Sequence, residues 1–189
     1  MAEGEMRDDA IWVTKIDVAR VQLCAAIRMF FERRDPVVAH SVISAGHQIL
    51  TDIGAASGVD GLLRGRSQSL DHIRPVNFAA NFFKHADRDS SARINIEPLP
   101  DLNAEFLMDA VVMLQNIVGE IPIEGKIFWS WFVSKHPDLF ENLSEKMVPR
   151  CADFDINVDD FEQISALLTF SEIQEYAASR APTDADGSK

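Results

Sequence analysis

The low cysteine content and the acidic, polar N-terminus limit the classes of protein to which the chain can belong. The 189 residues include only two cysteines, Cys24 and Cys151, and no Cys-x-x-Cys or Cys/His spacing of a structural zinc site. Two thiols cannot form the disulfide framework of a small secreted domain. The first ten residues are acidic and polar, unlike a signal peptide. We therefore predict two free thiols and a cytoplasmic protein.

Long apolar runs and nucleotide-binding motifs are also missing. No run approaches the roughly 20 apolar residues that a membrane-spanning helix needs. The sequence has no GxSxG, no GxGxxG after a strand, no Walker-type phosphate loop and no HExxH. These absences predict a protein without membrane association and without a cofactor.

Basic charge is scarce as well, except in one segment. The net charge is −12, but residues 61–93 contain six basic and three acidic side chains, whereas residues 94–189 contain six basic and eighteen acidic ones. Because phosphate contacts dominate non-specific binding of nucleic acid, so acidic a chain is a poor general binder. The basic segment either faces an anion or pairs with the acidic C-terminal half.

Apolar residues that recur at three- and four-residue steps predict an all-α fold. We expect one bundle of five or six helices over residues 13–180, with a flexible segment at 1–12 and a disordered tail at 181–189. A loop is expected at 54–65. The predicted helices cover 14–33, 36–56, 75–84, a segment around 106–117 capped by Asp101 or Asn103, 122–135, and a region from 159 with a restart at Ser171.

Two segments predict more specific features. In helix 36–56 five apolar residues share one sector of the helix surface, and Ile43 and Leu50 lie on another side. Apolar residues on two sides predict a central helix with neighbours on both. That sector consists of Val38, Val42, Ala45, Ile49 and Ile53. Arg93–Glu97 alternates with period two, which predicts a minor extended segment or strand with 155–158 as its partner.

Histidines provide the only plausible metal ligands. His40, His47, His72 and His85 could converge with Asp87 or Asp89 inside a bundle. The seven-residue step between His40 and His47 separates them by about 10 Å along the helix, which disfavours a shared ion. We therefore predict no metal site, and expect these two histidines to be hydrogen-bonded where core meets surface.

The strongest functional candidate is a polar stripe on helix 75–84. At 100° per residue, Asn77, Asn81, Lys84 and His85 share one arc, opposite an arc of phenylalanine and alanine. Asparagine is a poor helix former, so helix propensity does not explain two asparagines at i and i+4. With Arg88 nearby, the stripe could bind an anionic ligand, could bond to backbone of the same chain, or could simply be solvated.

The residues Asn81-Phe82-Phe83-Lys84-His85 resemble the N-x-x-K-H form found in helical proteins similar to HEPN domains. The resemblance implies a compact helical bundle that engages RNA, since many members of that superfamily are metal-independent ribonucleases. Active members also have an arginine that is separated from the histidine by four to six intervening residues. This chain has Phe78, Ala79 and Ala80 there, so the resemblance implies a binding or structural role for Asn81 and His85 without robust cleavage.

Two other functions fit the same sequence. The chain could be an interaction module that forms a homodimer or hetero-complex through apolar helix faces, best supplied by the aromatic helix Phe128–Phe132. It could also be a metal-dependent enzyme of the helical-bundle type, the least favoured of the three.

Overall fold

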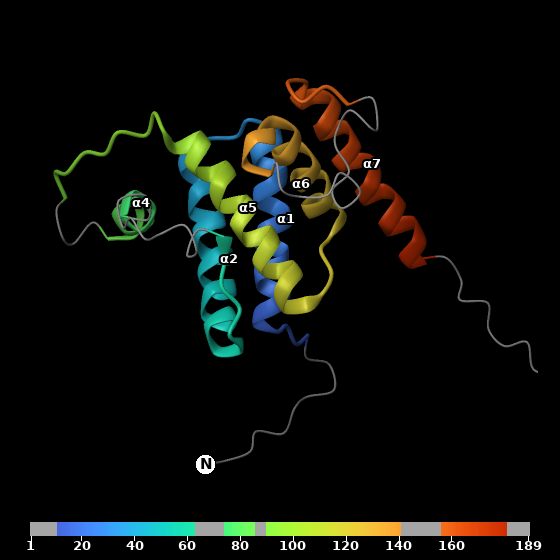
Figure 1. Cartoon of the computed structure of the whole chain (residues 1–189), viewed down its shortest axis with the longest axis horizontal. Coiled ribbons are helices and arrows are strands. Elements are labelled where there is room, and N and C mark those ends of the chain that lie inside the picture. The colour runs from blue at the N-terminus through green and yellow to red at the C-terminus, as the bar shows by residue number, and fades with distance from the viewer. Residues whose placement is uncertain (1–10, 63–73, 86–89, 141–155, 181–189) are drawn as a thin grey trace, which may run out of the picture.

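The computed structural model describes residues 11–62, 74–85, 90–140 and 156–180, and the side chains of all of these except 74–77 and 171–180. Within these ranges the chain is helical and contains no strand, which confirms the predicted all-α class (Figure 1). The elements are α1 (Lys15–Phe31), α2 (Pro36–Ser57), α4 (Arg74–Lys84), α5 (Leu99–Val118), α6 (Ile123–Lys135), the 3-10 helix η1 (Pro137–Phe140) and α7 (Phe161–Arg180). The predictions for residues 1–10 and 181–189 lie outside these ranges.

Side-chain caps fix the residues at which the first two helices begin. The Thr14 hydroxyl accepts a 3.1 Å bond from the Asp17 N–H, while the Asp17 carboxylate accepts a 2.8 Å bond from the Thr14 N–H. The Thr14 hydroxyl also donates to that carboxylate, and this bond with the backbone bond holds the pKa of Asp17 below its ordinary value. Asp35 caps α2 ahead of Pro36, as predicted.

Helix α2 is central, as its two-sided pattern predicts, because it packs against α1, α4 and α5. Gly46 lets α1 approach closely: a Cβ there would lie 3.3 Å from the Gln22 Cβ. Gly54 belongs to α2 rather than to the predicted loop. A Cβ on Gly54 would lie 2.6 Å from the Val59 carbonyl oxygen, so only glycine fits where the chain folds back.

The buried face of α2 differs from the predicted sector. Ile43 and Leu50 are buried, whereas Val38 is 52% exposed and Ile49 only half-buried. The buried face also contains His40 and Ser44 with the two glycines. A wheel of apolar residues is therefore misleading here, because polar and small side chains make up much of the packed surface.

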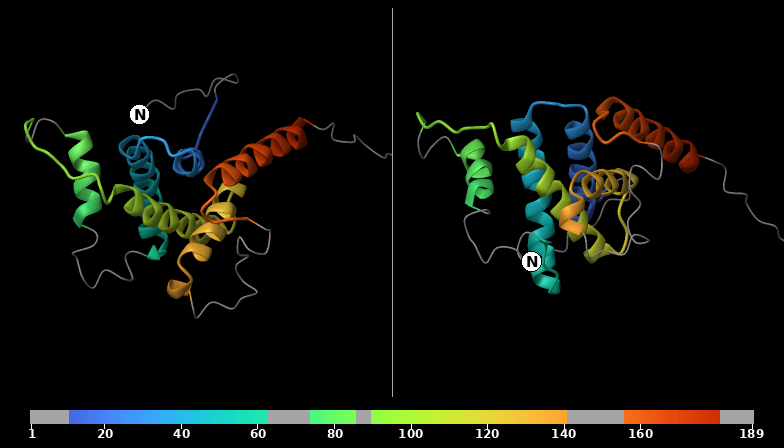
Figure 2. Two further views of the ribbon diagram at one scale, coloured as in Figure 1. Left: turned by 90° about the horizontal axis from the view of Figure 1, so that it is seen from above. Right: turned by 45° about the horizontal axis from the view of Figure 1, so that its top comes forward.

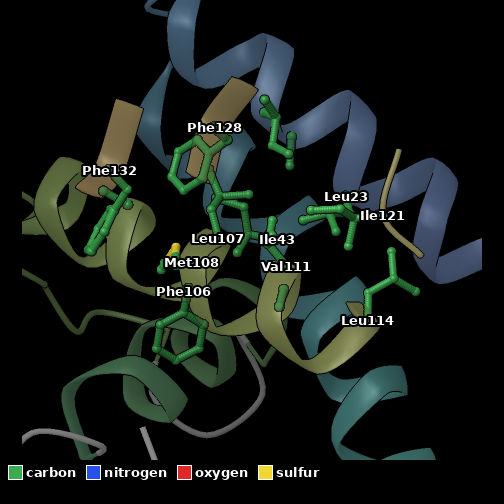
Figure 3. Close-up of a cluster of buried hydrophobic side chains, with 14 of the residues drawn as sticks. Leu23, Ile43, Phe106, Leu107, Met108, Val111, Leu114, Ile121, Phe128 and Phe132 are labelled. Carbon is green, nitrogen blue, oxygen red and sulfur yellow. The ribbon is translucent and has the colours of Figure 1, made fainter. Parts of the chain in front are cut away.

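The core lies between α1, α2, α5 and α6 (Figure 3). Leu107, Val111 and Leu114 of α5 are fully buried, and Phe128 of α6 packs edge-on against Phe30 of α1. Trp131 is 4% exposed and donates its indole N–H to the Val158 carbonyl at 2.9 Å. The aromatic helix is therefore core, which removes it as the best surface for an interaction module.

Two predicted helix boundaries are wrong, and the strand alternative for residues 93–97 is not formed. Helix α5 begins at Leu99 after Pro98, so Asn103 is buried inside the helix instead of capping it. Helix α7 continues through Ser171 without a restart. Residues 93–97 form no strand: Asn95 accepts a bond from the Glu97 N–H, and 156–158 lead into a turn. Side-chain bonds to backbone groups replace the sheet hydrogen bonds that an unpartnered strand would lack.

The two ends of the molecule differ in how they join this core. Helix α4 stands at one end and α7 at the other in all three views (Figures 1 and 2). Helix α7 packs through Ile164 and Leu168 against α1 and α6, whereas α4 packs against α2. None of the helices in the described ranges is long and apolar enough to cross a bilayer.

Candidate functional site

Helix α4 forms at the predicted position and has two opposed faces. Ala79 is buried, and the Phe83 ring, one turn later, meets the His40 ring of α2 edge-on with 5.8 Å between centroids. These residues define the face that packs on the bundle. The helix ends at Lys84, and the His85 N–H donates a 3.0 Å bond to the Asn81 carbonyl.

The polar stripe lies on the opposite half of α4. Asn81, Lys84 and His85 are all exposed, roughly 120–180° around the helix from the packed face. Asn77 belongs to the same helix, but its side chain is outside the described part of the chain, and so is Arg88. The structure thus brings three of the five predicted site residues together on one outward surface.

An aromatic ring adjoins the stripe. Phe78 is 58% exposed, three residues before Asn81, and its ring lies 6.3 Å from that of Phe82. Large exposed aromatic side chains are costly to leave in water and are common at binding surfaces. We call Phe78, Asn81, Lys84 and His85 the α4 outer face.

Beneath α4 lies a polar cluster that sequence reasoning placed only in part. His40 is fully buried and its Nδ1 lies 2.7 Å from Oδ1 of Asn103 on α5. The Asn103 amide in turn donates a 3.0 Å bond to the Pro36 carbonyl. The prediction that His40 is hydrogen-bonded is confirmed, but it lies inside the core and not at its boundary. Asn103 was missed because a wheel of apolar residues ignores buried amides.

His47 forms the second half of this cluster. Its Nε2 lies 2.6 Å from Oδ2 of Asp109, a buried carboxylate on α5. Gly61 covers the carboxylate, and a Cβ there would lie 2.5 Å from Asp109 Oδ1. The Thr51 hydroxyl donates to the His47 carbonyl, one turn back along α2. The pair therefore ties α2 to α5 in a closed setting.

Tilted and edge-on ring contacts join the two histidines to the outer face. Phe106 of α5 lies 4.6 Å from the His47 ring and 6.2 Å from the His40 ring, between centroids. Phe82 and Phe83 continue this contact into α4 at 6.0 Å. A continuous row of rings thus runs from the bundle seam to the surface of α4.

Metal binding is not favoured by this geometry. No group of three or more histidine, cysteine, aspartate or glutamate side chains in the described ranges could hold an ion. His40 and His47 each bond to a separate partner on α5. His72, Asp87 and Asp89 lie outside the described residues.

Comparisons of the chain with protein-family models, with curated proteins and with solved structures found no match. The candidate site therefore depends on the geometry of its own residues: an outward polar and aromatic face on α4, supported by a buried histidine.

Proposed function

We propose that this protein is a helical binding module, and that the α4 outer face binds an anionic ligand, of which RNA is the class that fits best. One observation carries the proposal. Asn81, Lys84 and His85 are exposed together on the side of α4 that does not pack on the bundle, beside the exposed ring of Phe78.

Each side chain suits a different part of a single-stranded RNA. Phe78 offers a ring on which an unpaired base stacks, and Asn81 offers both a donor and an acceptor to a base edge. Lys84 supplies a cation for phosphate, and His85 supplies a ring N–H. The N-x-x-K-H resemblance to HEPN-like proteins favours RNA over other anions.

The small number of phosphate contacts and the acidic net charge argue against strong non-specific binding. Within the described part of the α4 outer face, Lys84 and the His85 ring offer at most two phosphate contacts, and the chain has a net charge of −12. Two contacts on a single strand give a log–log salt slope of about −1.4. Affinity should then fall about seven-fold between 50 and 200 mM salt. We infer a weak, selective binder in a reducing compartment such as the cytoplasm.

Fluorescence anisotropy with a labelled single-stranded RNA about 12 nucleotides long tests this proposal. We expect binding at 50 mM salt that weakens about ten-fold on Lys84→Ala and on Phe78→Ala. Each loss corresponds to about 1.4 kcal/mol, close to the lower limit for a charged hydrogen bond and within the range for a base stack. Cleavage of the RNA is not expected.

Matched controls separate the α4 outer face from general charge. Lys126 of α6 and Asn116 of α5 are exposed residues of the same types, on helices of the bundle. Lys126→Ala and Asn116→Ala should leave the affinity within two-fold of wild type. Equal losses at Lys84 and Lys126, or no binding at 50 mM salt, would overturn the proposal and favour an interaction module.

A further inference from the structure

The outer side of the hairpin formed by α1 and α2 is apolar and partly exposed. Helices α5 and α6 pack on the inner side of this hairpin (Figures 1 and 2). At 100° per residue, a set of apolar side chains on both helices lies toward the opposite side. We call this set the α1–α2 outer face, and it consists of Val18, Val21, Ala25 and Met29 of α1 and Val38, Val42, Ala45, Ile49 and Ile53 of α2.

This face is exposed to an extent that points to a partner. Val21 is 68% exposed and Val38 is 52% exposed, and the other members of the face are half-buried. None of its residues is charged, although the chain has a net charge of −12. A contiguous apolar surface of this kind on a globular domain marks an interaction site. Its partner should therefore present an apolar surface of similar size.

The spacing of the face on α2 is symmetric about Ala45. Val42 and Ile49 lie three residues before and four residues after it, and Val38 and Ile53 lie seven before and eight after. An antiparallel copy of α2 centred on Ala45 would therefore place apolar residues against apolar residues along the whole helix. Such self-complementarity is what a two-fold symmetric interface requires.

The part of the face on α1 has the same centre. Its four residues are spaced around a midpoint near residue 23. The contact between Gly46 and Gln22 fixes the height of one helix against the other, because a Cβ on Gly46 would lie 3.3 Å from the Gln22 Cβ. The two midpoints thus lie within about one or two residues of the same height, a displacement of about 2 Å at the helical rise. One two-fold axis that crosses both helices serves the whole face.

Charged residues at the rim favour the antiparallel arrangement. Asp17 and Arg28 lie on the same edge of α1, six residues before and five residues after residue 23. Arg28 donates to Glu124 of α6, and its side chain is still 31% exposed. Antiparallel pairing brings Asp17 of one copy toward Arg28 of the other. Parallel pairing would bring Asp17 toward Asp52 of the second copy, where two carboxylates repel each other.

The size of the face suits a reversible dimer. Helix α1 has 17 residues and α2 has 22, so the two share a length of about 26 Å, and side by side they are about 20 Å wide. Each copy then contributes roughly 500 Å² and the pair about 1,000 Å², the lower limit for a specific interface. We expect a dissociation constant of about 10 μM.

We propose that this protein forms a two-fold symmetric homodimer through the α1–α2 outer face, with α1 against α1 and α2 against α2 in antiparallel orientation. The inference uses no residue of α4 and does not depend on the proposed ligand. It replaces the aromatic residues of α6, which are core, with a surface that the structure leaves exposed.

Sedimentation equilibrium of the full chain without nucleic acid tests the dimer. The weight-average mass should rise from 21.1 kDa toward twice that value between about 1 and 200 μM. Val21→Lys and Val38→Lys should each weaken association more than about ten-fold, although both reduce the net negative charge. Val118→Lys, at an exposed valine of α5, should change it by less than about two-fold.

Disulfide cross-linking tests the orientation, in a chain that also contains Cys24→Ser and Cys151→Ser. Ala45→Cys lies next to the two-fold axis, so mild oxidation should link two copies. Val38→Cys should not link, because antiparallel pairing separates the two copies of residue 38 by about 22 Å along the helix. A monomer at all concentrations, or a dimer that both lysine variants leave intact, would overturn the proposal. Cross-linking of Val38→Cys as efficient as that of Ala45→Cys, or none with Ala45→Cys, would overturn the antiparallel orientation.

Discussion

The bundle and helix α4 are stabilised in different ways. In the bundle, α1, α2, α5 and α6 bury whole aliphatic and aromatic side chains, such as Leu50, Leu107 and Phe128 at 0% exposure. Among the described side chains of α4, Ala79 is buried, Phe82 and Phe83 are half-buried, and Phe78 is 58% exposed. A helix whose described side chains are buried so little should open locally at a lower free energy than global unfolding. The bundle thus serves as the scaffold, and α4 presents its outer face from it.

The largest expected effect compares phenylalanine in the two regions. Phe128→Ala removes a fully buried ring and should lower the free energy of unfolding by about 3–5 kcal/mol. Phe78→Ala removes an exposed ring and should change it by about 0.5 kcal/mol or less. Urea denaturation of both variants measures the difference. Similar losses for the two would mean that α4 belongs to the same cooperative core.

The second-largest loss of stability is expected at the contact between α2 and α5. Asp109→Ala removes the buried acceptor of His47 and should cost about 1–3 kcal/mol. Asn116→Ala, at an exposed position on the same helix, should change stability by about 0.5 kcal/mol or less. Equal denaturation midpoints for the two variants would show that the buried pair contributes nothing net.

A smaller effect is expected on the docking of α4 against the bundle. Phe83→Ala removes a half-buried ring and should cost about 1 kcal/mol of docking free energy. Amide hydrogen exchange within α4 should then accelerate roughly five-fold, while α5 amides keep their protection. Equal acceleration in α5 would contradict the separation of the two regions.

The smallest effect concerns the cap of α1. Thr14→Ala should destabilise the protein by about 1 kcal/mol, because Asp17 N–H loses its side-chain acceptor. The same bonds hold the pKa of Asp17 low. The stability linked to Asp17 is therefore present above its unfolded value of about 3.9 and is lost as pH falls below it. The difference between wild type and Thr14→Ala in thermal melts should therefore narrow as pH falls through the titration of Asp17, while the part due to the Asp17 N–H bond remains.

Local signals in the sequence predicted the fold well and its buried polar residues poorly. The Asp35-Pro36 cap and the three- and four-residue apolar steps gave the starts of α1, α2 and α6 within a residue or so. The face of α2 was misassigned because its packed surface includes His40, Ser44 and two glycines. Their burial depends on partners on α1 and α5, which no short window contains.

The candidate site was likewise predictable from the sequence only in part. Helical periodicity alone grouped Asn81, Lys84 and His85, and the structure places them together and exposed. Periodicity could not reveal that Phe83 rests on His40, because 43 residues of sequence separate them. It gave no sign of Asp109 either, since that residue falls in an apolar run and is buried by tertiary contact.

The most direct measurement of the central claim is an amide chemical-shift titration of the full chain with single-stranded RNA at 50 mM salt. The account expects perturbations concentrated on Phe78–His85, with little change in α6 and α7. It also expects Lys84→Ala to reduce those perturbations without altering the free energy of unfolding by more than about 0.5 kcal/mol. Perturbations centred on any other helix, or none at that salt concentration, would contradict the assignment of α4 as the binding element.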